Sequence, residues 1–285
     1  MLTEATWNLL LERIRKGVCT PFLGAGACAG TLPLGANVAM QWAQEHHYPL
    51  NNPNNLVEVA QFLAVQFDLL FPKEKILKLI AGVKAPDFAA RDEPHGVLAD
   101  LPLPVYMTTN YDDFMVQALK NRYRDAKQEL CRWNEAVQDV PSIFDTPDFS
   151  PTVANPVVYH LHGHTLPESL VLTEDDYLNF LASIARNPGL LPSRIQKALD
   201  LSTCLFIGYR LADWNFRVLF QGLKPRLKIT NVAVMMPPED PEVARRQREY
   251  LNRYYQTMDL HVYWGSARQF AADLRDRWTK FKSRS

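Results

Sequence analysis

The sequence predicts an α/β fold built on a Rossmann-like parallel sheet with flanking helices, and two observations support this prediction. Short apolar runs of strand length recur along the chain, and segments with helical spacing of apolar residues separate them. Strands that are apolar throughout are typical of parallel sheets, which helices cover on both faces. The predicted strands are residues 18–23, 105–109, 157–161, 204–207, 232–236 and 261–263.

Helical patterns fill the intervals between these strands. Several of them begin at an acidic residue or a proline, which helix amino termini prefer. The first 17 residues also have the amphipathic pattern of a helix, unlike the apolar core of a signal peptide. The predicted helices beyond the second strand are residues 112–120, 174–184, 191–199, 213–223, 241–255 and 267–280.

The interval between the first two predicted strands, residues 24–104, is too long for a single crossover helix. Polar segments at 49–55 and 84–93 predict loops around the helical patterns of this interval. Farther along the chain, a polar stretch at 140–156 predicts a surface loop. We therefore expect a single domain over residues 1–285, with a helical insertion over about residues 37–95. The helical patterns of the insertion are residues 37–46, 56–69 and 73–81.

Composition excludes several classes of protein. The 31 basic and 31 acidic residues give a formal net charge of zero, so no global field favours nucleic acid or an anionic membrane. No apolar run approaches the roughly 20 residues of a membrane span. The four cysteines, Cys19, Cys28, Cys131 and Cys204, form no C-x-x-C pair, so we expect neither a metal site nor disulfides. We expect a protein of the reducing cytoplasm.

A glycine-rich turn, Gly24-Ala25-Gly26, follows the first predicted strand. Glycine there would permit positive φ angles and would let backbone amides approach a diphosphate without an intervening side chain. The same residues are also compatible with an ordinary tight turn. Gly30 stands four residues beyond Gly26, which breaks the G-x-G-x-x-G spacing and disfavours a hydride-transferring dehydrogenase.

Polar residues also follow three later strands. Ligands of open α/β sheets bind at the carboxyl ends of the strands, so these positions are candidates for a site. Each residue has a simpler explanation, because aspartates cap helices and a buried histidine can belong to the core. Packing alone does not require such residues at successive strand ends, so the combination favours function. The candidates are Thr109, Asn110, Asp112, Asp113, His160, His162, His164, Gly208 and Asp213.

These motifs resemble the NAD-binding motifs of sirtuins, and they occur in the sirtuin order. The three matching segments are Gly24-Ala25-Gly26, Thr109-Asn110-Tyr111-Asp112 and Leu161-His162-Gly163. Residues 172–177 and 208–216 further resemble the divergent prokaryotic sirtuin-like branch, many of whose members hydrolyse NAD in anti-phage defence. The resemblance implies that NAD is the substrate.

The resemblance also implies roles for individual residues. Gly24 and Gly26 would contact the diphosphate, and Asn110 would hold the ribose and the attacking water. Asp112 would lie by the nicotinamide amide, and His162 would be the general base. His160 and His164 match no catalytic position and are interpreted as structural or rim residues. The other residues expected to bind NAD are Ala25, Cys28, Thr109, Gly208 and Asp213, the last two on the adenosine side.

Two departures from the sirtuin pattern refine the expected reaction. Cys28 replaces the usual serine, and its weaker hydrogen bonding puts a phosphate contact in doubt. Deacylating sirtuins generally have a four-cysteine zinc module that shapes the peptide cleft, and this chain cannot build one. Water is therefore favoured over an acyl-lysine as acceptor. We expect an NAD+ glycohydrolase (NADase) that releases nicotinamide and ADP-ribose and depletes NAD during anti-phage defence.

Two alternatives remain at this stage, an NAD-dependent protein deacylase and a non-catalytic sensor of NAD or ADP-ribose that acts through assembly. Members of the defence branch commonly oligomerise or depend on a partner. We accordingly expect a homo-oligomer, with a partner ATPase or sensor protein as a further possibility. The chain is expected to be a standalone effector or the amino-terminal domain of a longer protein.

Overall fold

The computed structural model describes residues 2–187, 189–209, 230–237 and 241–283. These residues form a seven-stranded sheet of order β3-β4-β2-β1-β5-β6-β7 in which every pairing is parallel. The predicted α/β class is confirmed. The strands are β1 (Cys19–Leu23), β2 (Val105–Thr108), β3 (Lys127–Leu130), β4 (Val157–His160), β5 (Thr203–Ile207), β6 (Asn231–Met235) and β7 (Leu260–Trp264).

Apolar runs form the central strands because both faces of the sheet are covered. All residues of β1, β2, β4, β5 and β6 are buried. The edge strand β3, with sequence KQEL, was missed because its charged and polar residues do not form an apolar run. Charged side chains on an edge strand discourage pairing with another chain. The same side chains remove the apolar pattern by which a strand is predicted from sequence.

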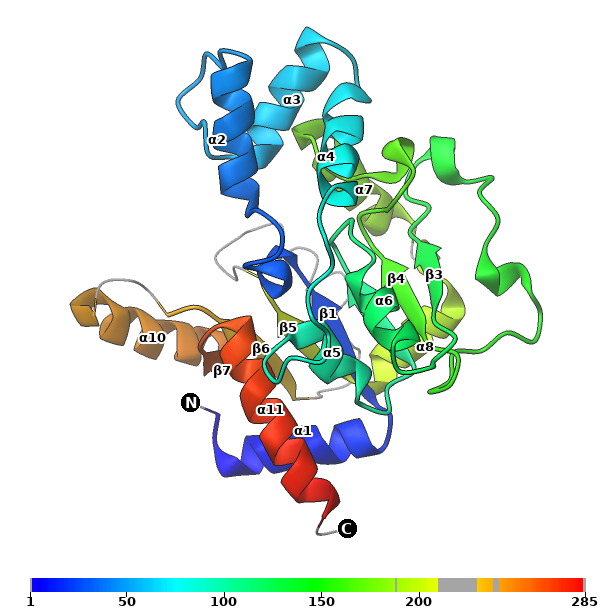
Figure 1. Ribbon diagram of the computed structural model, residues 1–285, viewed down its shortest axis with the longest axis vertical. Coiled ribbons are helices and arrows are strands. Elements are labelled where there is room, and N and C mark those ends of the chain that lie inside the picture. The colour runs from blue at the N-terminus through cyan, green and yellow to red at the C-terminus, as the bar shows by residue number, and fades with distance from the viewer. Residues whose placement is uncertain (1, 188, 210–229, 238–240, 284–285) are drawn as a thin grey trace.

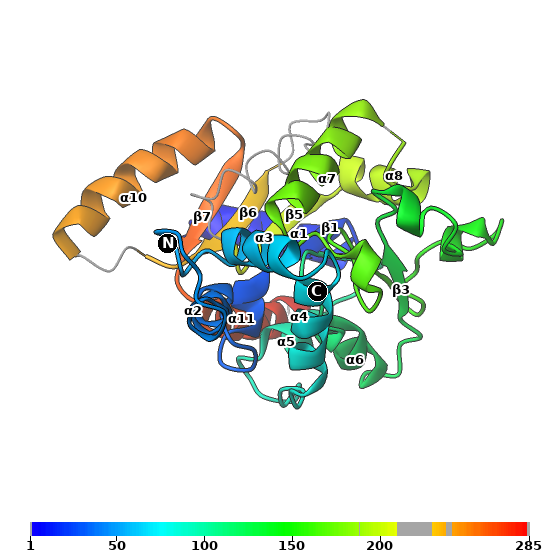
Figure 2. The ribbon, with the colours of Figure 1, turned by 90° about the horizontal axis from the view of Figure 1, so that it is seen from above.

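Helices cover both faces of the sheet (Figures 1 and 2). On one face lie α5 (Pro94–Ala99), α6 (Phe114–Lys120) and α11 (Ala267–Lys282), which share a core with α1 (Glu4–Arg15). On the other lie α7 (Glu174–Arg186), α8 (Ser193–Leu201) and α10 (Pro241–Gln256). These helices confirm the predictions to within a few residues, except that α5 was missed and the helix predicted at 213–223 lies outside the described residues. No helix in the described ranges has both the length and the apolar character of a membrane span.

Three helices of the interval after β1 rise beyond one end of the sheet (Figure 1). They are α2 (Gly35–Glu45), α3 (Leu56–Gln66) and α4 (Phe71–Ala81), and they pack around Trp42 and Leu63 in a small core that Leu170 and Leu172 of the sheet domain complete. The α3 helix ends three residues before its predicted end. The Asp68 carboxylate accepts hydrogen bonds from the backbone amides of Leu70 and Phe71 and so starts the turn into α4.

A largely buried ion pair ties these helices to the sheet domain. The Lys73 ammonium on α4 lies 2.7 Å from Asp176 Oδ1 on α7, with side-chain exposures of 7% and 13%. The second carboxylate oxygen accepts the backbone amides of Leu172 and Thr173, and the ammonium lies 6.0 Å from the centre of the Trp133 ring. Asp176 therefore holds α4 and the start of α7 together.

Replacing Lys73 by alanine should leave the Asp176 charge buried without its partner, and the expected loss in free energy of unfolding is about 3 kcal/mol. Lys75 on the same helix pairs with the half-exposed Glu45 and serves as the matched control. Lys75→Ala should cost about 1 kcal/mol or less. Urea denaturation of the three proteins measures both values, and equal losses for the two variants would contradict the anchoring by Asp176.

Candidate active site

The carboxyl ends of four adjacent strands, β4, β2, β1 and β5, bear the candidate motifs. Strand order reverses at β1, because β2 lies on one side of it and β5 on the other. In doubly wound sheets such a switch point opens the crevice in which ligands bind. The residues that follow these strands are His162, Asn110, Gly24 and Gly208, so the four motifs meet at this point.

The glycine turn after β1 packs directly against the end of β5. The Gly24 amide donates to the Ile207 carbonyl at 2.9 Å, and the Gly26 amide donates to the Gly208 carbonyl at 3.0 Å. A Cβ atom on Gly26 would lie 2.8 Å from Gly208 Cα, and one on Gly208 would lie 2.3 Å from the Ala27 nitrogen. Close approach of the two segments is therefore the reason that glycine is needed here.

This arrangement corrects two expectations about the turn. Gly24 has a φ of −115°, and the positive φ of +85° belongs to Gly208 on the opposite side. The Gly24 and Gly26 amides are also already bonded to β5 carbonyls, so they are not aimed at a diphosphate. The physical reason is that β5, a distant segment of the chain, supplies the acceptors. Ala25 is the first residue of a short 3-10 helix, η1 (Ala25–Cys28), and is exposed.

Asn110 connects three of the four strand ends. Its side-chain amide donates to the Gly24 carbonyl at 3.2 Å and contacts Cys28 Sγ at 3.3 Å. Its backbone amide donates to Thr108 Oγ1 at 2.9 Å, and its carbonyl lies 3.2 Å from His160 Nδ1. These contacts fix the half-buried Asn110 side chain before any ligand binds.

His160 is fully buried, and its ring holds the Asn110 backbone. Burial, and next the nearby His164, lower the pKa of His160 to about 3. The two rings lie 4.4 Å apart, and His160 Nε2 has no hydrogen-bond partner among the described residues. Burial also lowers the pKa of His164. Neutral His160 thus acts as a positioning residue for Asn110, which agrees with the structural interpretation of this histidine.

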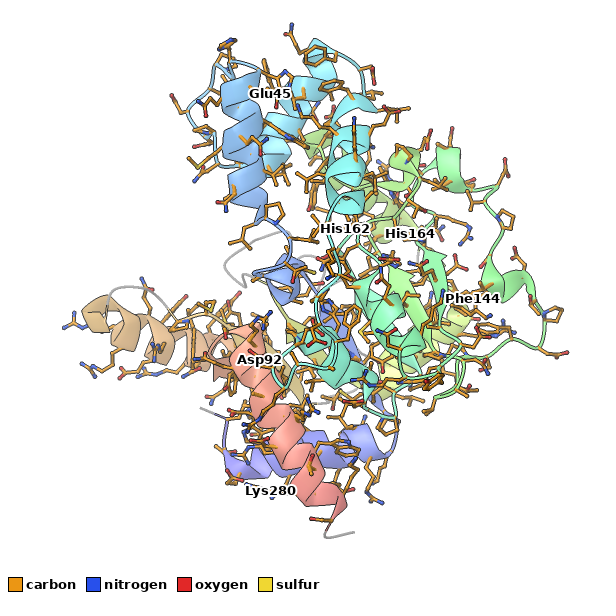
Figure 3. All side chains as sticks on the ribbon, in the orientation of Figure 1. Glu45, Asp92, Phe144, His162, His164 and Lys280 are labelled. Carbon is orange, nitrogen blue, oxygen red and sulfur yellow. The ribbon has the colours of Figure 1, made fainter. Side chains whose placement is uncertain are left out.

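His162 lies at the sheet end that faces the helices α2 to α4 (Figure 3). It is 8% exposed, and its ring makes edge-to-face contacts with Tyr177 and Phe180 at 5.3 and 5.0 Å between centres. Burial lowers the pKa of His162 to about 3, so the imidazole is neutral at physiological pH and one ring nitrogen keeps a free lone pair. Within the part of the chain that the structure describes, its ring nitrogens have no hydrogen-bond partner.

The glycine that follows His162 is required by the backbone. Gly163 has a φ of +78°, and a Cβ atom there would lie 2.2 Å from the Ser169 carbonyl oxygen. The next loop therefore folds back onto this position, and the Val171 amide donates to the His162 carbonyl at 3.1 Å. This close return fixes the backbone from which the His162 ring projects.

Asp112 is buried with both carboxylate oxygens occupied. One accepts the Phe114 amide at 3.0 Å, at the start of α6, whose N-cap residue is Asp113, and the other accepts the Cys28 thiol at 3.3 Å. Burial, and next the neighbouring Asp112 charge, raise the pKa of the Cys28 thiol well above its usual value. Cys28 is therefore a protonated hydrogen-bond donor that orients Asp112.

Sequence reasoning missed two further residues of this network, Glu93 and His95. His95 Nε2 lies 3.8 Å from Cys28 Sγ, and His95 Nδ1 lies 2.7 Å from Glu93 Oε1. Burial opposes ionisation of Glu93, but hydrogen bonds from His95 and the Gly96 amide outweigh it and lower the pKa of the carboxyl. The only local signal was Glu93-Pro94, a helix start, and nothing local linked His95 to a cysteine 67 residues away.

Of the remaining predicted residues, the structure describes Thr109. Thr109 Oγ1 lies 3.2 Å from the Tyr209 hydroxyl, which also donates to the Leu23 carbonyl at 3.0 Å. Thr109 thus joins the β2 end to the segment after β5. Asp213 lies outside the described residues.

The chain is similar to proteins of known family and name. The family described as "SIR2-like domain" matches residues 104–260. Relatives named NAD(+) hydrolase ThsA occur in Acinetobacter baumannii (strain 532279), with 29% identity over 135 residues, 46% of this chain and 24% of that protein. The one from Bacillus cereus (strain MSX-D12) is 28% identical over 186 residues, 64% of this chain and 34% of that protein. The one from Enterococcus faecium is 26% identical over 133 residues, 46% of this chain and 25% of that protein.

The matched portion of this chain thus spans between 24% and 34% of the length of these relatives. The family match itself covers more than half of the chain, from the residue before β2 to the first residue of β7. It therefore includes the strand ends that bear Asn110 and His162. On the strength of this match and of the parallel sheet with its switch point at β1, the chain belongs to the SIR2-like domain family.

Proposed function

We propose that this chain is an NAD+ glycohydrolase that transfers the ADP-ribosyl group of NAD to water, giving nicotinamide and ADP-ribose. The observation that supports it most strongly is the placement of Asn110 and His162 on the neighbouring strands β2 and β4, beside the switch point at β1. The relatives named NAD(+) hydrolase, at 26–29% identity, support the same reaction.

The chemistry of the bond sets what the site must supply. Cleavage of the nicotinamide–ribose bond develops positive charge on the sugar, as in glycoside hydrolysis. The leaving group is already cationic and departs neutral, so no strong general acid is required. The site must instead orient the ribose and the water and must accept a proton. Asn110, held by the Gly24 carbonyl, would orient both without adding charge.

His162 would accept the proton from the ribose hydroxyl or from water. Its burial keeps the imidazole in the proton-accepting form across the physiological range, and the rings of Tyr177 and Phe180 fix its plane. Asp112, oriented by the Cys28 thiol, would lie by the nicotinamide amide. The other residues that we assign to NAD binding are Ala25, Cys28, Thr109, Gly208 and Asp213, and Gly24 and Gly26 would form the wall of the turn beside them without donating their amides.

We assign residues 1–285 to one NAD-binding domain with an insertion over about residues 37–95, which the packing of α2, α3 and α4 around one apolar cluster supports. Water is the proposed acceptor because the four cysteines are free and buried and do not form a zinc module of the deacylase kind. In the cell, we propose a cytoplasmic anti-phage effector that depletes NAD, assembles as a homo-oligomer and answers to a partner ATPase or sensor protein.

Asn110→Ala and His162→Ala should each reduce NAD cleavage by a factor of about 100 or more, since each removes an orienting or proton-accepting group. Chromatography of NAD incubated with each protein measures nicotinamide and ADP-ribose, and circular dichroism verifies the fold. The matched control is His47→Ala, an exposed histidine on the turn after α2, which should behave like wild type. Wild-type turnover in both site variants would refute the assignment, and deacylation of an added acyl-peptide in step with nicotinamide release would indicate a deacylase.

The pH dependence follows from the lowered pKa of His162. The proton-accepting form is populated above a pKa of about 3, so kcat/KM should stay flat from about pH 5 to pH 8 instead of falling below the usual histidine pKa of 6.5. Stability, unlike the rate, should depend on pH. The unfolded state binds more protons between pH 6.5 and 3, so the free energy of unfolding falls as pH decreases. Rates are therefore compared where circular dichroism shows folded protein. An acid limb centred near 6.5 would contradict the prediction.

Gly208→Ala should weaken NAD binding by at least about tenfold, because the added Cβ atom would displace the turn that ends at Gly26. Gly30→Ala is a matched control, since Gly30 also has a positive φ, of +88°, but has open space around the added atom. Isothermal titration with a hydrolysis-resistant NAD analogue measures both affinities. Equal weakening in the two variants would show that backbone strain, and not close approach, governs the turn.

A further inference from the structure

We propose that Cys28, His95 and Asp112 form a Zn²⁺ site at the base of the candidate active site, and that zinc bound there inhibits NAD cleavage. The metal site is a proposal about these side chains alone. The inhibition rests on the proposed function, because it requires that Asn110 and Asp112 act on NAD.

The separations of the sulfur from the other two donor atoms fit tetrahedral zinc. Cys28 Sγ lies 3.3 Å from Asp112 Oδ2 and 3.8 Å from His95 Nε2, and all three atoms lie within 4.8 Å of one another. Zinc bonds of about 2.3 Å to sulfur and about 2.0 Å to nitrogen or oxygen place tetrahedral ligand atoms about 3.5 Å apart. The two separations from sulfur therefore differ from this ideal by only about 0.3 Å.

The donors are also chemically suited to zinc and well buried. Thiolate, imidazole and carboxylate are its ordinary protein ligands, and Cys28, His95 and Asp112 are 3%, 1% and 6% exposed. Over the described ranges of the chain, they make up the one cluster of three or more such residues close enough to share a metal ion. The other cysteines do not belong to any such group.

A hydrogen bond from outside the cluster prepares His95 as a ligand. Its Nδ1 lies 2.7 Å from Glu93 Oε1, and the Gly96 amide donates to the second oxygen of Glu93 at 2.5 Å. A proton shared with the carboxylate at Nδ1 leaves the lone pair of Nε2 facing Cys28. Carboxylate–histidine pairs of this kind orient the histidine ligands of most zinc sites.

Charge favours a divalent cation at this position. Glu93 and Asp112 are buried carboxylates, and among the described residues neither forms an ion pair with a lysine or an arginine. Zinc would form a bond to Cys28 sulfur, and the thiol proton would pass to solvent, so one proton is released for each metal ion bound. The thiolate and the Asp112 carboxylate then balance the two charges of zinc.

Zinc binding would also disable the site. The thiol hydrogen bond that orients Asp112 would be lost, and the carboxylate would turn to the metal. Asn110, whose side-chain nitrogen lies 3.3 Å from Cys28 Sγ, would face a cation at the place where we propose that the positively charged nicotinamide ribose binds. Repulsion between the two cations opposes binding of NAD.

The test of the site uses cobalt as a spectroscopic probe for zinc. The full chain is treated with a chelator, desalted and titrated with CoCl2 in the absence of NAD. The expected result is one cobalt per chain, with the strong visible bands of tetrahedral cobalt and a thiolate charge-transfer band in the near ultraviolet. ZnCl2 should remove the spectrum, because zinc binds such sites more tightly than cobalt.

Variants assign the ligands. Cys28→Ser should abolish the charge-transfer band, His95→Gln should abolish tight binding, and Glu93→Gln should weaken it by about 10- to 100-fold. Cys131→Ser, which changes another buried thiol, is the matched control and should keep the wild-type spectrum. If His95→Gln does not fold, Cys28→Ser and Glu93→Gln still decide the assignment. No tetrahedral spectrum in folded wild type, or a spectrum unchanged in Cys28→Ser, would overturn the site.

The inhibition is tested separately by measuring NAD cleavage with and without ZnCl2. Wild type should lose at least tenfold in rate and recover on addition of a chelator, and Cys131→Ser should respond in the same way. Zinc binding with unchanged cleavage would overturn the inhibition. Cobalt binding in a chain that never cleaves NAD, with or without chelator, would refute the proposed function while leaving the metal site established.

Discussion

The close contact between the β1 turn and the end of β5 is the constraint on which the rest of the site depends. Two backbone amides, of Gly24 and Gly26, donate across it to the carbonyls of Ile207 and Gly208. With its amide so engaged, Gly24 still offers its carbonyl to the Asn110 side chain. The short helix η1 begins directly after this contact and places Cys28 against Asp112. The ends of β1, β2 and β5 therefore lie around one polar cluster.

Burial determines the protonation states of His160, His162 and Cys28. His160 and His162 are neutral because no nearby carboxylate offsets the cost of burying their charge, and the same environment keeps the Cys28 thiol protonated. A neutral amide and a neutral imidazole suit a reaction in which the leaving group already bears the positive charge. The two histidines nevertheless differ, since His160 holds the Asn110 backbone while His162 has ring nitrogens left for a substrate.

Much of the fold could be predicted because fully buried parallel strands are continuous apolar runs, as in β1 and β5. The exceptions have local causes: β3 is polar because it lies at an edge, and α5 is a helix of only six residues, too short to show a helical pattern. The meeting of Gly24, Asn110, His162 and Gly208 could be anticipated because the ends of parallel strands lie at one edge. Contacts between side chains far apart in sequence could not, and they include His95 with Cys28 and the β5 carbonyls that engage the glycine amides.

The central claim is that four strand ends form a single NAD pocket, and hydrogen–deuterium exchange with a hydrolysis-resistant carba-NAD tests it most directly. The account predicts that saturating ligand slows exchange together in peptides covering residues 22–30, 107–113, 159–164 and 205–209. Exchange of the backbone amides of β6 and β7 should not change, since these strands lie away from the switch point at β1. Protection confined to one of the four segments, or absent from all of them at saturating ligand, would contradict the account.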